Sequence, residues 1–178
     1  MDTFDAIAAR RSYRGKYLST PIPKDHLKAI AEAGYHAPSG CNKQTTSFIV
    51  VDDPDLLAQL HGVIQPPRGE TAPAMICILT RRILAYRDRT FYIQDYSAAI
   101  QNMLLAIVEL GYASCWFEGH ITDTDRIGWQ MQKILGVPEE YELVCFLPVG
   151  IPAEPLSPIS KQPMEERIWY NGFQSPMK

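Results

Sequence analysis

The sequence lacks the motifs that mark the commonest nucleotide-binding and hydrolytic folds. It contains no G-x-G-x-x-G fingerprint, no G-x-x-x-x-G-K-[ST] phosphate loop and no G-x-S-x-G nucleophile elbow. A Rossmann dinucleotide site, a P-loop and a serine hydrolase of the α/β type are therefore not expected. If the chain binds a phosphorylated ligand, it must do so with a different architecture.

Long apolar runs and an excess of positive charge are also missing. No apolar segment approaches the length of a membrane span, so no membrane association is expected. The segment 1–5 lacks the basic start and apolar run of a signal peptide, which predicts a cytoplasmic protein. A formal charge of -3 and a pI near 5.8 argue against nucleic acid as a partner.

The four cysteines include no C-x-x-C pair, and the four histidines form no metal-ligand spacing with them or with each other. No metal site is expected. Cys77, Cys115 and Cys145 lie in apolar runs, which predicts buried, reduced thiols. Cys41 lies in a polar segment, where it is either a reactive thiol or an incidental loop cysteine.

The composition, with 46% hydrophobic and 21% charged residues in 178, is that of one globular domain over 1–178. Apolar periodicity and Pro/Gly punctuation predict strands and helices mixed around one sheet. Such a pattern gives a three-layer sandwich of the α+β or α/β class. The predicted strands are 47–51, 74–79, 113–117 and 143–147, the predicted helices 2–10, 24–35, 53–60, 93–110 and 124–135, and an extended arm covers about 151–178.

The predicted helix over 93–110 has almost no polar face. A helix that is apolar all round is buried, either in the centre of a domain or between subunits. Gly111 follows it at the position of a left-handed cap.

Two segments are rich in arginine. Arg10-Arg11-Ser12-Tyr13-Arg14 follows the first predicted helix and is either an anion cradle or a solvated basic turn. Arg81, Arg82, Arg87 and Arg89 surround Tyr86; they form either a solvated connection or a receptor for an anionic substrate tail or cofactor phosphate.

Four features in register give the chain a resemblance to the FMN-dependent nitroreductase family. They are the basic segment 10–14, the segment Ala37-Pro38-Ser39-Gly40-Cys41-Asn42-Lys43-Gln44, the apolar helix running into 111–116, and the segment 135–139 followed by a strand and Lys161-Gln162-Pro163. The resemblance implies an α+β, three-layer α/β/α sandwich with a central mixed or antiparallel sheet. It also implies a homodimer in which the long helix lies at the interface.

The resemblance further implies which residues bind FMN. Arg10, Ser12 and Lys161 match the family's phosphate contacts, with Arg11 in the same cluster, and two cations suit a phosphate. Arg14 matches a basic residue near the isoalloxazine ring, where fixed positive charge stabilises the reduced anionic flavin. The remaining ring contacts would be Gln65 and Arg68 at the pyrimidine edge and the turn Glu118-Gly119 beside N5.

Trp116 and Phe117 either line one face of the ring or pack as strand core. Pro38, Ser39, Gly40 and Asn42 match the family segment that reaches the flavin of the partner subunit, so each site would need the homodimer. Two departures are that Thr45-Thr46 follows Gln44 where many members have Pro-Trp, and that the segment 80–97 is short where larger members insert a lid. A more open or smaller pocket is expected.

The implied activity is ping-pong transfer of two electrons from NAD(P)H through FMN to an electron-poor small molecule such as a nitroaromatic or quinone. Positioning and electrostatics would carry the first half-reaction, so no catalytic side chain is assigned. Two alternatives stay open: related flavin chemistry, such as reductive dehalogenation or flavin breakdown, and a dimer that binds or senses flavin without turnover.

Overall fold

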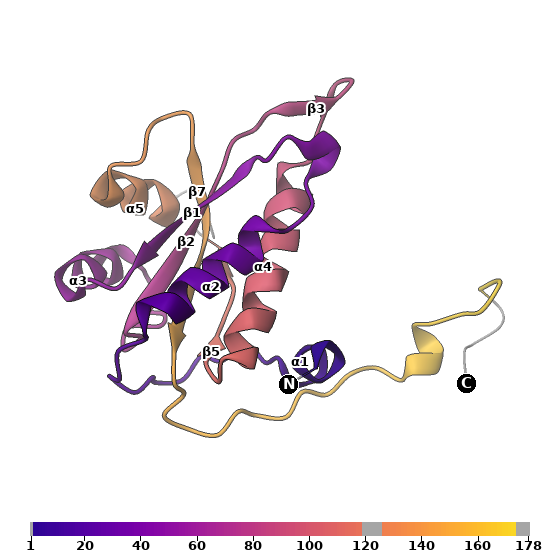
Figure 1. Cartoon of the computed structure of the whole chain (residues 1–178), viewed down its shortest axis with the longest axis horizontal. Coiled ribbons are helices and arrows are strands. Elements are labelled where there is room, and N and C mark those ends of the chain that lie inside the picture. The colour runs from indigo at the N-terminus through magenta and orange to yellow at the C-terminus, as the bar shows by residue number, and fades with distance from the viewer. Residues whose placement is uncertain (1, 119–125, 174–178) are drawn as a thin grey trace.

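The computed structural model describes residues 2–118 and 126–173 (Figure 1). Its centre is a five-stranded sheet in the order β1-β2-β7-β5, with β6 also paired to β7. Every pairing in this sheet is antiparallel. The strands are β1 (Thr46–Val51), β2 (Ala74–Thr80), β5 (Ala113–Ser114), β6 (Phe117–Glu118) and β7 (Glu142–Gly150).

Helices cover both faces of this sheet, as Figure 1 shows. On one face, α2 (Lys24–Tyr35) and α4 (Tyr92–Glu109) enclose a core that includes Ile30, Ile76 and Ile100. On the other, α3 (Pro54–Val63) and α5 (Ile127–Leu135) enclose a second core that includes Met131 and Phe146. This confirms the predicted α+β three-layer sandwich.

The two central strands are buried because their side chains are apolar on both faces. All seven residues of β2 are buried, and β7 is buried from Leu143 to Gly150. A continuous apolar run is what a strand covered by helices on both sides requires. Folding therefore removes far more apolar surface from water at β2 and β7 than at the edge strand β1.

One predicted strand is interrupted. The segment 113–117 forms two short strands, and the ladder with β7 breaks at Cys115 and Trp116. β7 itself continues through Pro148, past the predicted end at residue 147, and Pro148 lies opposite this break. Because proline has no N–H to donate, the ladder cannot run on evenly there.

The helix ends follow from local hydrogen bonds. The Asp53 side chain accepts from the Leu56 N–H at 2.9 Å and caps α3, which extends to Val63, beyond the predicted end at Leu60. After α4, Gly111 takes a φ of 83°, and the Tyr112 N–H donates to the Ile107 carbonyl at 2.9 Å. This is the left-handed cap predicted from the glycine.

A hairpin that was not predicted connects β2 to α4. β3 (Leu84–Tyr86) and β4 (Arg89–Thr90) pair with each other and project from the body of the molecule (Figure 1). No local pattern indicates this hairpin, because both strands are very short and mostly exposed.

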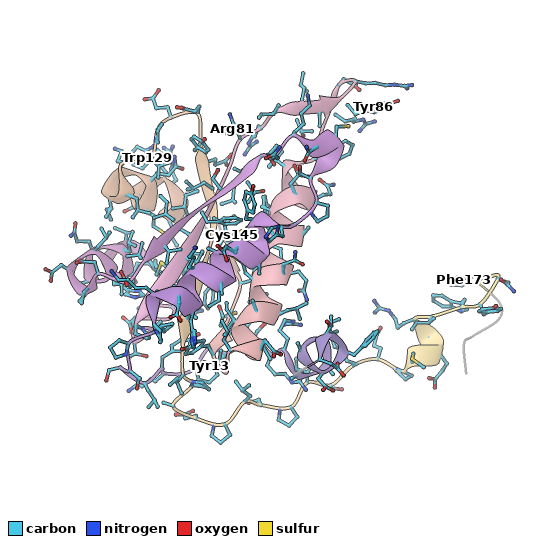
Figure 2. The ribbon with its side chains drawn as sticks, viewed as in Figure 1. Tyr13, Arg81, Tyr86, Trp129, Cys145 and Phe173 are labelled. Carbon is cyan, nitrogen blue, oxygen red and sulfur yellow. The ribbon has the colours of Figure 1, made fainter. Side chains whose placement is uncertain are left out.

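The helix α1 and the arm after Gly150 lie at the periphery of the fold. The helix α1 (Thr3–Ala9) packs against α4, and the arm after Gly150 runs extended past α1 before the short 3-10 helix η2 (Met164–Glu166). Figure 2 shows Phe173 far from the body of the molecule. Apolar side chains on these segments are exposed, including Phe4, Ile7, Ile159, Met164 and Phe173.

The long helix α4 is only partly buried within one chain. Ile100, Met103 and Ile107 are fully buried, whereas Ile93 is about half exposed and Gln101 is exposed. Within one chain, burial in the domain centre therefore accounts only for the inner side of this helix. Its outer face is available for further packing.

Candidate functional site

Three cations from opposite ends of the chain line one hollow. Arg10 and Arg11 follow the end of α1, and the extended arm brings Lys161 to the same place. The hollow has a volume of about 340 Å³, and its wall is completed by Ile7, Ala8, Gln101 and Ile159. A concentration of positive charge around a hollow suits a phosphate group.

The three cations are not equivalent. The Arg11 guanidinium donates to the backbone carbonyls of Ala8 and Arg10, so it serves the carboxyl end of α1. Arg10 is half buried and Lys161 is exposed. Arg10 and Lys161 are therefore better placed than Arg11 to give their donors to an anion.

The basic segment continues along the sheet. Ser12 forms an isolated parallel bridge with Ser114 of β5, and the Tyr13 N–H donates to the Ser114 carbonyl at 2.8 Å. Tyr13 is buried with Tyr17, their rings meeting edge to face at 5.1 Å. This anchoring leaves Ser12 and Arg14 exposed on either side of a fixed backbone.

The Cys115 thiol is influenced by several of the predicted site residues. Burial raises the pKa of this thiol, and the positive charges of Arg14, Arg10 and Arg68 and a hydrogen bond from Ser12 act against that rise. Four predicted site residues thus act on one thiol next to β5. Sequence reasoning treated Cys115 as core and did not connect it with this site.

Gln65 and Arg68 lie on the loop between α3 and β2. Both are exposed, the peptide bond between Gln65 and Pro66 is cis, and Arg68 Nη1 donates to the Pro67 carbonyl at 3.0 Å. Gly69 has a φ of 67°, and a Cβ there would lie 2.5 Å from the Pro148 side chain. This close approach packs the loop onto β7, and the Arg68 charge acts on the Cys115 thiol.

Trp116 and Phe117 face opposite sides of the sheet. Trp116 is half buried against the α2–α4 core, and its Nε1 donates to the Cys145 sulfur at 3.1 Å. Phe117 is buried in the α3–α5 core and stacks on Phe146 with ring centroids 5.4 Å apart. Phe117 therefore packs as strand core, whereas Trp116 lies on the α4 side of the sheet.

Glu118 and Cys145 are linked across the sheet. The Cys145 thiol, in the centre of the molecule in Figure 2, donates to Glu118 Oε2 at 3.3 Å. Burial, then the Glu118 charge and this hydrogen bond, raise the pKa of the thiol, so Cys145 stays protonated. Gly119 lies outside the described residues.

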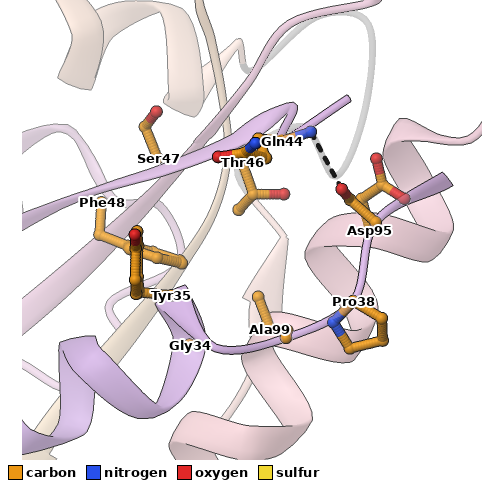
Figure 3. Close-up of a pocket in the computed structure, with 11 residues that line it drawn as sticks. Gly34, Tyr35, Pro38, Gln44, Thr46, Ser47, Phe48, Asp95 and Ala99 are labelled. Carbon is orange, nitrogen blue, oxygen red and sulfur yellow. Dashed lines mark hydrogen bonds between the residues drawn. The ribbon is translucent and has the colours of Figure 1, made fainter. Parts of the chain in front are cut away.

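Pro38 and Ser39 line a second hollow, of about 390 Å³, together with Tyr35, Gln44 and Asp95 (Figure 3). Gly40 and Asn42 belong to the adjoining 3-10 turn η1 (Gly40–Asn42), and the Gln44 N–H donates to Ser39 Oγ at 3.0 Å. Asp95, at 4% exposure, was not singled out by sequence reasoning. The sequence feature that could have identified Asp95 is its position as an acid near the start of the most apolar helix.

Within one chain, the Pro38–Asn42 segment and the basic hollow are separate. The segment packs on the first turn of α4, whereas α1 packs against the later part of this helix (Figure 1), and the basic hollow reaches α4 at Gln101. The two hollows share no lining residue: Asp95 and Ala99 of α4 line the one, and Gln101 lines the other. The structure thus brings together the basic residues but not the Pro38–Asn42 segment.

In the second arginine cluster, Arg82 already has partners within the chain. Arg82 binds Glu142 through two hydrogen bonds of 2.7 and 2.8 Å, and its guanidinium lies over the Tyr92 ring. Arg87 and Arg89 are exposed on the projecting hairpin. Among the described residues there is no group of three metal-ligating side chains, and no described helix is long and apolar enough to cross a membrane.

Comparison with known proteins gives consistent matches. The family model described as the nitroreductase family matches residues 7–66 and 61–151. A protein of Methanothermobacter thermautotrophicus, provisionally named NADH dehydrogenase/NAD(P)H nitroreductase, is 32% identical over 157 residues, or 86% of this chain and 79% of that protein.

An iodotyrosine deiodinase of Nematostella vectensis is 24% identical over 199 residues, covering 92% of this chain and 72% of that protein. The crystal structure of a nitroreductase with bound FMN from Bacteroides fragilis superposes with a TM-score of 0.78. It is 26% identical and covers 97% of this chain and all of that one.

Proposed function

The chain belongs to the nitroreductase family, and from this premise we propose that it is an FMN-dependent oxidoreductase. Its reaction is a two-electron transfer from NAD(P)H to a small electron-poor acceptor such as a nitroaromatic or a quinone. The observation that carries the proposal is the convergence of Arg10 and Lys161 on one hollow beside α1.

The residues present fit FMN. Arg10 and Lys161 would hold the phosphate, with Arg11 fixing the end of α1 and Ser12 turning its hydroxyl from the Cys115 thiol to the phosphate. Arg14 and Arg68 place positive charge next to Cys115, where negative charge on a reduced ring is favoured. Gln65 and the turn Glu118-Gly119 are proposed as the polar contacts of the ring.

When bound, FMN would supply the chemistry, taking two electrons from the nicotinamide and returning them to the acceptor. The chain's own residues would bind the phosphate, orient the ring and set its electrostatics. Trp116, held by its hydrogen bond to Cys145, would border the ring on the α4 side. No side chain needs to abstract a proton in the first half-reaction.

We further propose that the protein is a homodimer with a flavin site at each subunit boundary. Pro38, Ser39, Gly40 and Asn42 would act on the partner's flavin, which accords with their separation from the basic hollow of their own chain. The exposed apolar residues of α1, α4 and the arm supply an interface, since large exposed apolar patches mark association surfaces.

The test is steady-state kinetics of the FMN-loaded protein with NADPH or NADH and either a nitroaromatic or menadione. Parallel lines in double-reciprocal plots would support ping-pong transfer. Absence of turnover with every donor and acceptor would reduce the proposal to a flavin-binding dimer.

The relationship to iodotyrosine deiodinase supports reductive dehalogenation as a second candidate. Iodide release from 3-iodotyrosine by the dithionite-reduced protein would favour it. Release no faster than from free reduced FMN would exclude it.

A further inference from the structure

Asp95 is the only formally charged side chain among the buried residues that the structure describes. It lies in the first turn of α4, where the helix dipole favours negative charge. Its Oδ1 accepts from the Gly40 N–H and its Oδ2 from the Thr45 hydroxyl, each at 2.7 Å. Two short charge-assisted hydrogen bonds compensate the loss of water around this carboxylate.

The two bonds enclose a strained segment. Cys41, Asn42 and Gln44 have φ angles of 50°, 53° and 49°, in the left-handed region that non-glycine residues rarely adopt. Such a conformation costs free energy and persists only where surrounding contacts impose it. The Asp95 bonds fall on Gly40 and Thr45, immediately before and after these residues.

A second contact fixes the same segment. A Cβ at Gly40 would lie 2.6 Å from the Phe91 side chain, so the backbone rests directly on the start of α4. Figure 3 shows Asp95 on α4 beside Pro38 and Gln44. The segment is thus clamped to one helix turn at Gly40 and Thr45.

The clamped residues contribute little to their own core. Cys41, Asn42 and Gln44 are all exposed, although the backbone that presents them is held by a buried charge. Buried hydrogen bonds that fix an exposed, strained turn are expected where the turn binds another molecule. Under the proposed function this molecule is the FMN of the partner subunit, because the adjoining segment 38–42 is proposed to reach it.

We propose that Asp95 is a positioning residue that acts across the subunit boundary, holding Pro38–Asn42 in the conformation that binds the partner's FMN. The inference rests on the proposed function and adds to it a residue that touches neither flavin nor substrate. It predicts that damage at Asp95 appears in the site of the other subunit.

Three substitutions separate this role from simple packing. Asp95→Ala removes both bonds, and Thr45→Val removes only the Oδ2 bond with little change of shape. Asp95→Asn keeps both, because the amide oxygen can accept from Gly40 while its NH₂ donates to the Thr45 hydroxyl. The expected loss of FMN affinity is about tenfold or more for Asp95→Ala, smaller for Thr45→Val and slight for Asp95→Asn.

A matched control is available on the other face of the sheet. Gln132 of α5 likewise makes two hydrogen bonds: its Nε2 donates to the Tyr141 carbonyl at 2.9 Å, and its Oε1 accepts from the Leu143 N–H at 3.0 Å. Gln132→Ala should lower the melting temperature as Asp95→Ala does while FMN affinity stays at the wild-type value. Equal FMN affinity in the two alanine variants would overturn the proposal.

The conformation of the segment can be read without FMN. Cys41 is the one exposed thiol of the four, so a spin label attached there reports on the clamped turn in the cofactor-free protein. Label motion should increase in Asp95→Ala and remain at the wild-type level in Asp95→Asn. An unchanged spectrum in Asp95→Ala would show that Asp95 does not fix the segment.

The closing experiment uses mixed dimers in which one subunit carries Asp95→Ala and the other Arg10→Ala, purified through two different tags. One of the two sites then combines an intact Arg10 with an intact clamp, and the other carries both defects. The proposal predicts one FMN per mixed dimer at wild-type affinity. Two weakened sites would overturn it, whereas wild-type dimers that bind no FMN would refute the proposed function, and the spin label still tests the clamp.

Discussion

Removal of the Arg10 guanidinium tests the basic hollow with little disturbance of the fold. The backbone N–H of Arg10 closes α1 through a 3.0 Å bond to the Ala6 carbonyl, and Arg10→Ala keeps that bond. The side chain is half buried in the wall of the hollow. The substitution therefore removes a cation and its donors while leaving the helix end in place.

The size of the effect follows from the kind of bond that is lost. A hydrogen bond to a charged group is worth about 1.5–3 kcal/mol, which corresponds to an approximately 10- to 150-fold change in Kd. Arg10 is only half buried and Lys161 remains in the same hollow. We therefore expect a weakening near the lower end of this range, and a smaller one at high salt because exposed charges are screened.

The assay is equilibrium titration of FMN fluorescence against the cofactor-free protein at fixed ionic strength. Lys28→Ala is the matched control, because Lys28 is an exposed cation paired with Glu32 on the surface of α2. It should leave FMN affinity unchanged, and both variants should melt near the wild-type temperature. Equal FMN affinity in Arg10→Ala and Lys28→Ala would refute the phosphate assignment.

Three further perturbations test the fold and its electrostatics. Burial lowers the pKa of His61 below its ordinary value of 6.5, and the Glu70 charge opposes this shift. The unfolded chain therefore takes up the proton first, and stability falls as pH drops below about 6.5. Between pH 7.5 and 5.5 the melting temperature of His61→Gln should fall less than that of wild type, and equal falls would contradict this. Only the exposed Cys41 should react promptly with Ellman's reagent in the native protein, whereas four thiols should react in denaturant; more than one fast native thiol would contradict the burial. Gly69→Ala should destabilise the chain by about 1–3 kcal/mol because of its positive φ and its approach to Pro148, and a denaturant midpoint equal to that of wild type would contradict that account.

Strong apolar periodicity predicted most of the fold. The continuous run at 74–79 identified a strand buried on both faces, and Gly111 identified the end of the long helix. The break at Cys115 was not predictable from the apolar run itself, since it depends on Pro148 in a neighbouring strand. Tertiary pairing, which no local pattern contains, decided that boundary.

The candidate site also contains residues that the sequence predicted and one that it did not. The basic character of Arg10 and Lys161 is visible in the sequence, and the structure adds that the arm brings them to one hollow. Asp95 was missed because an isolated acid in an apolar helix has no local partner. Its donors lie 50 and 55 residues away, at Thr45 and Gly40.

The central claim is that this chain binds FMN and uses it for electron transfer. The most direct measurement is the visible spectrum of the protein reconstituted with FMN, followed under anaerobic conditions as NADPH and then NADH are added. We predict that the oxidised flavin band bleaches with at least one of the two donors. Flavin that fails to bind, or that stays oxidised with both donors, would contradict the claim.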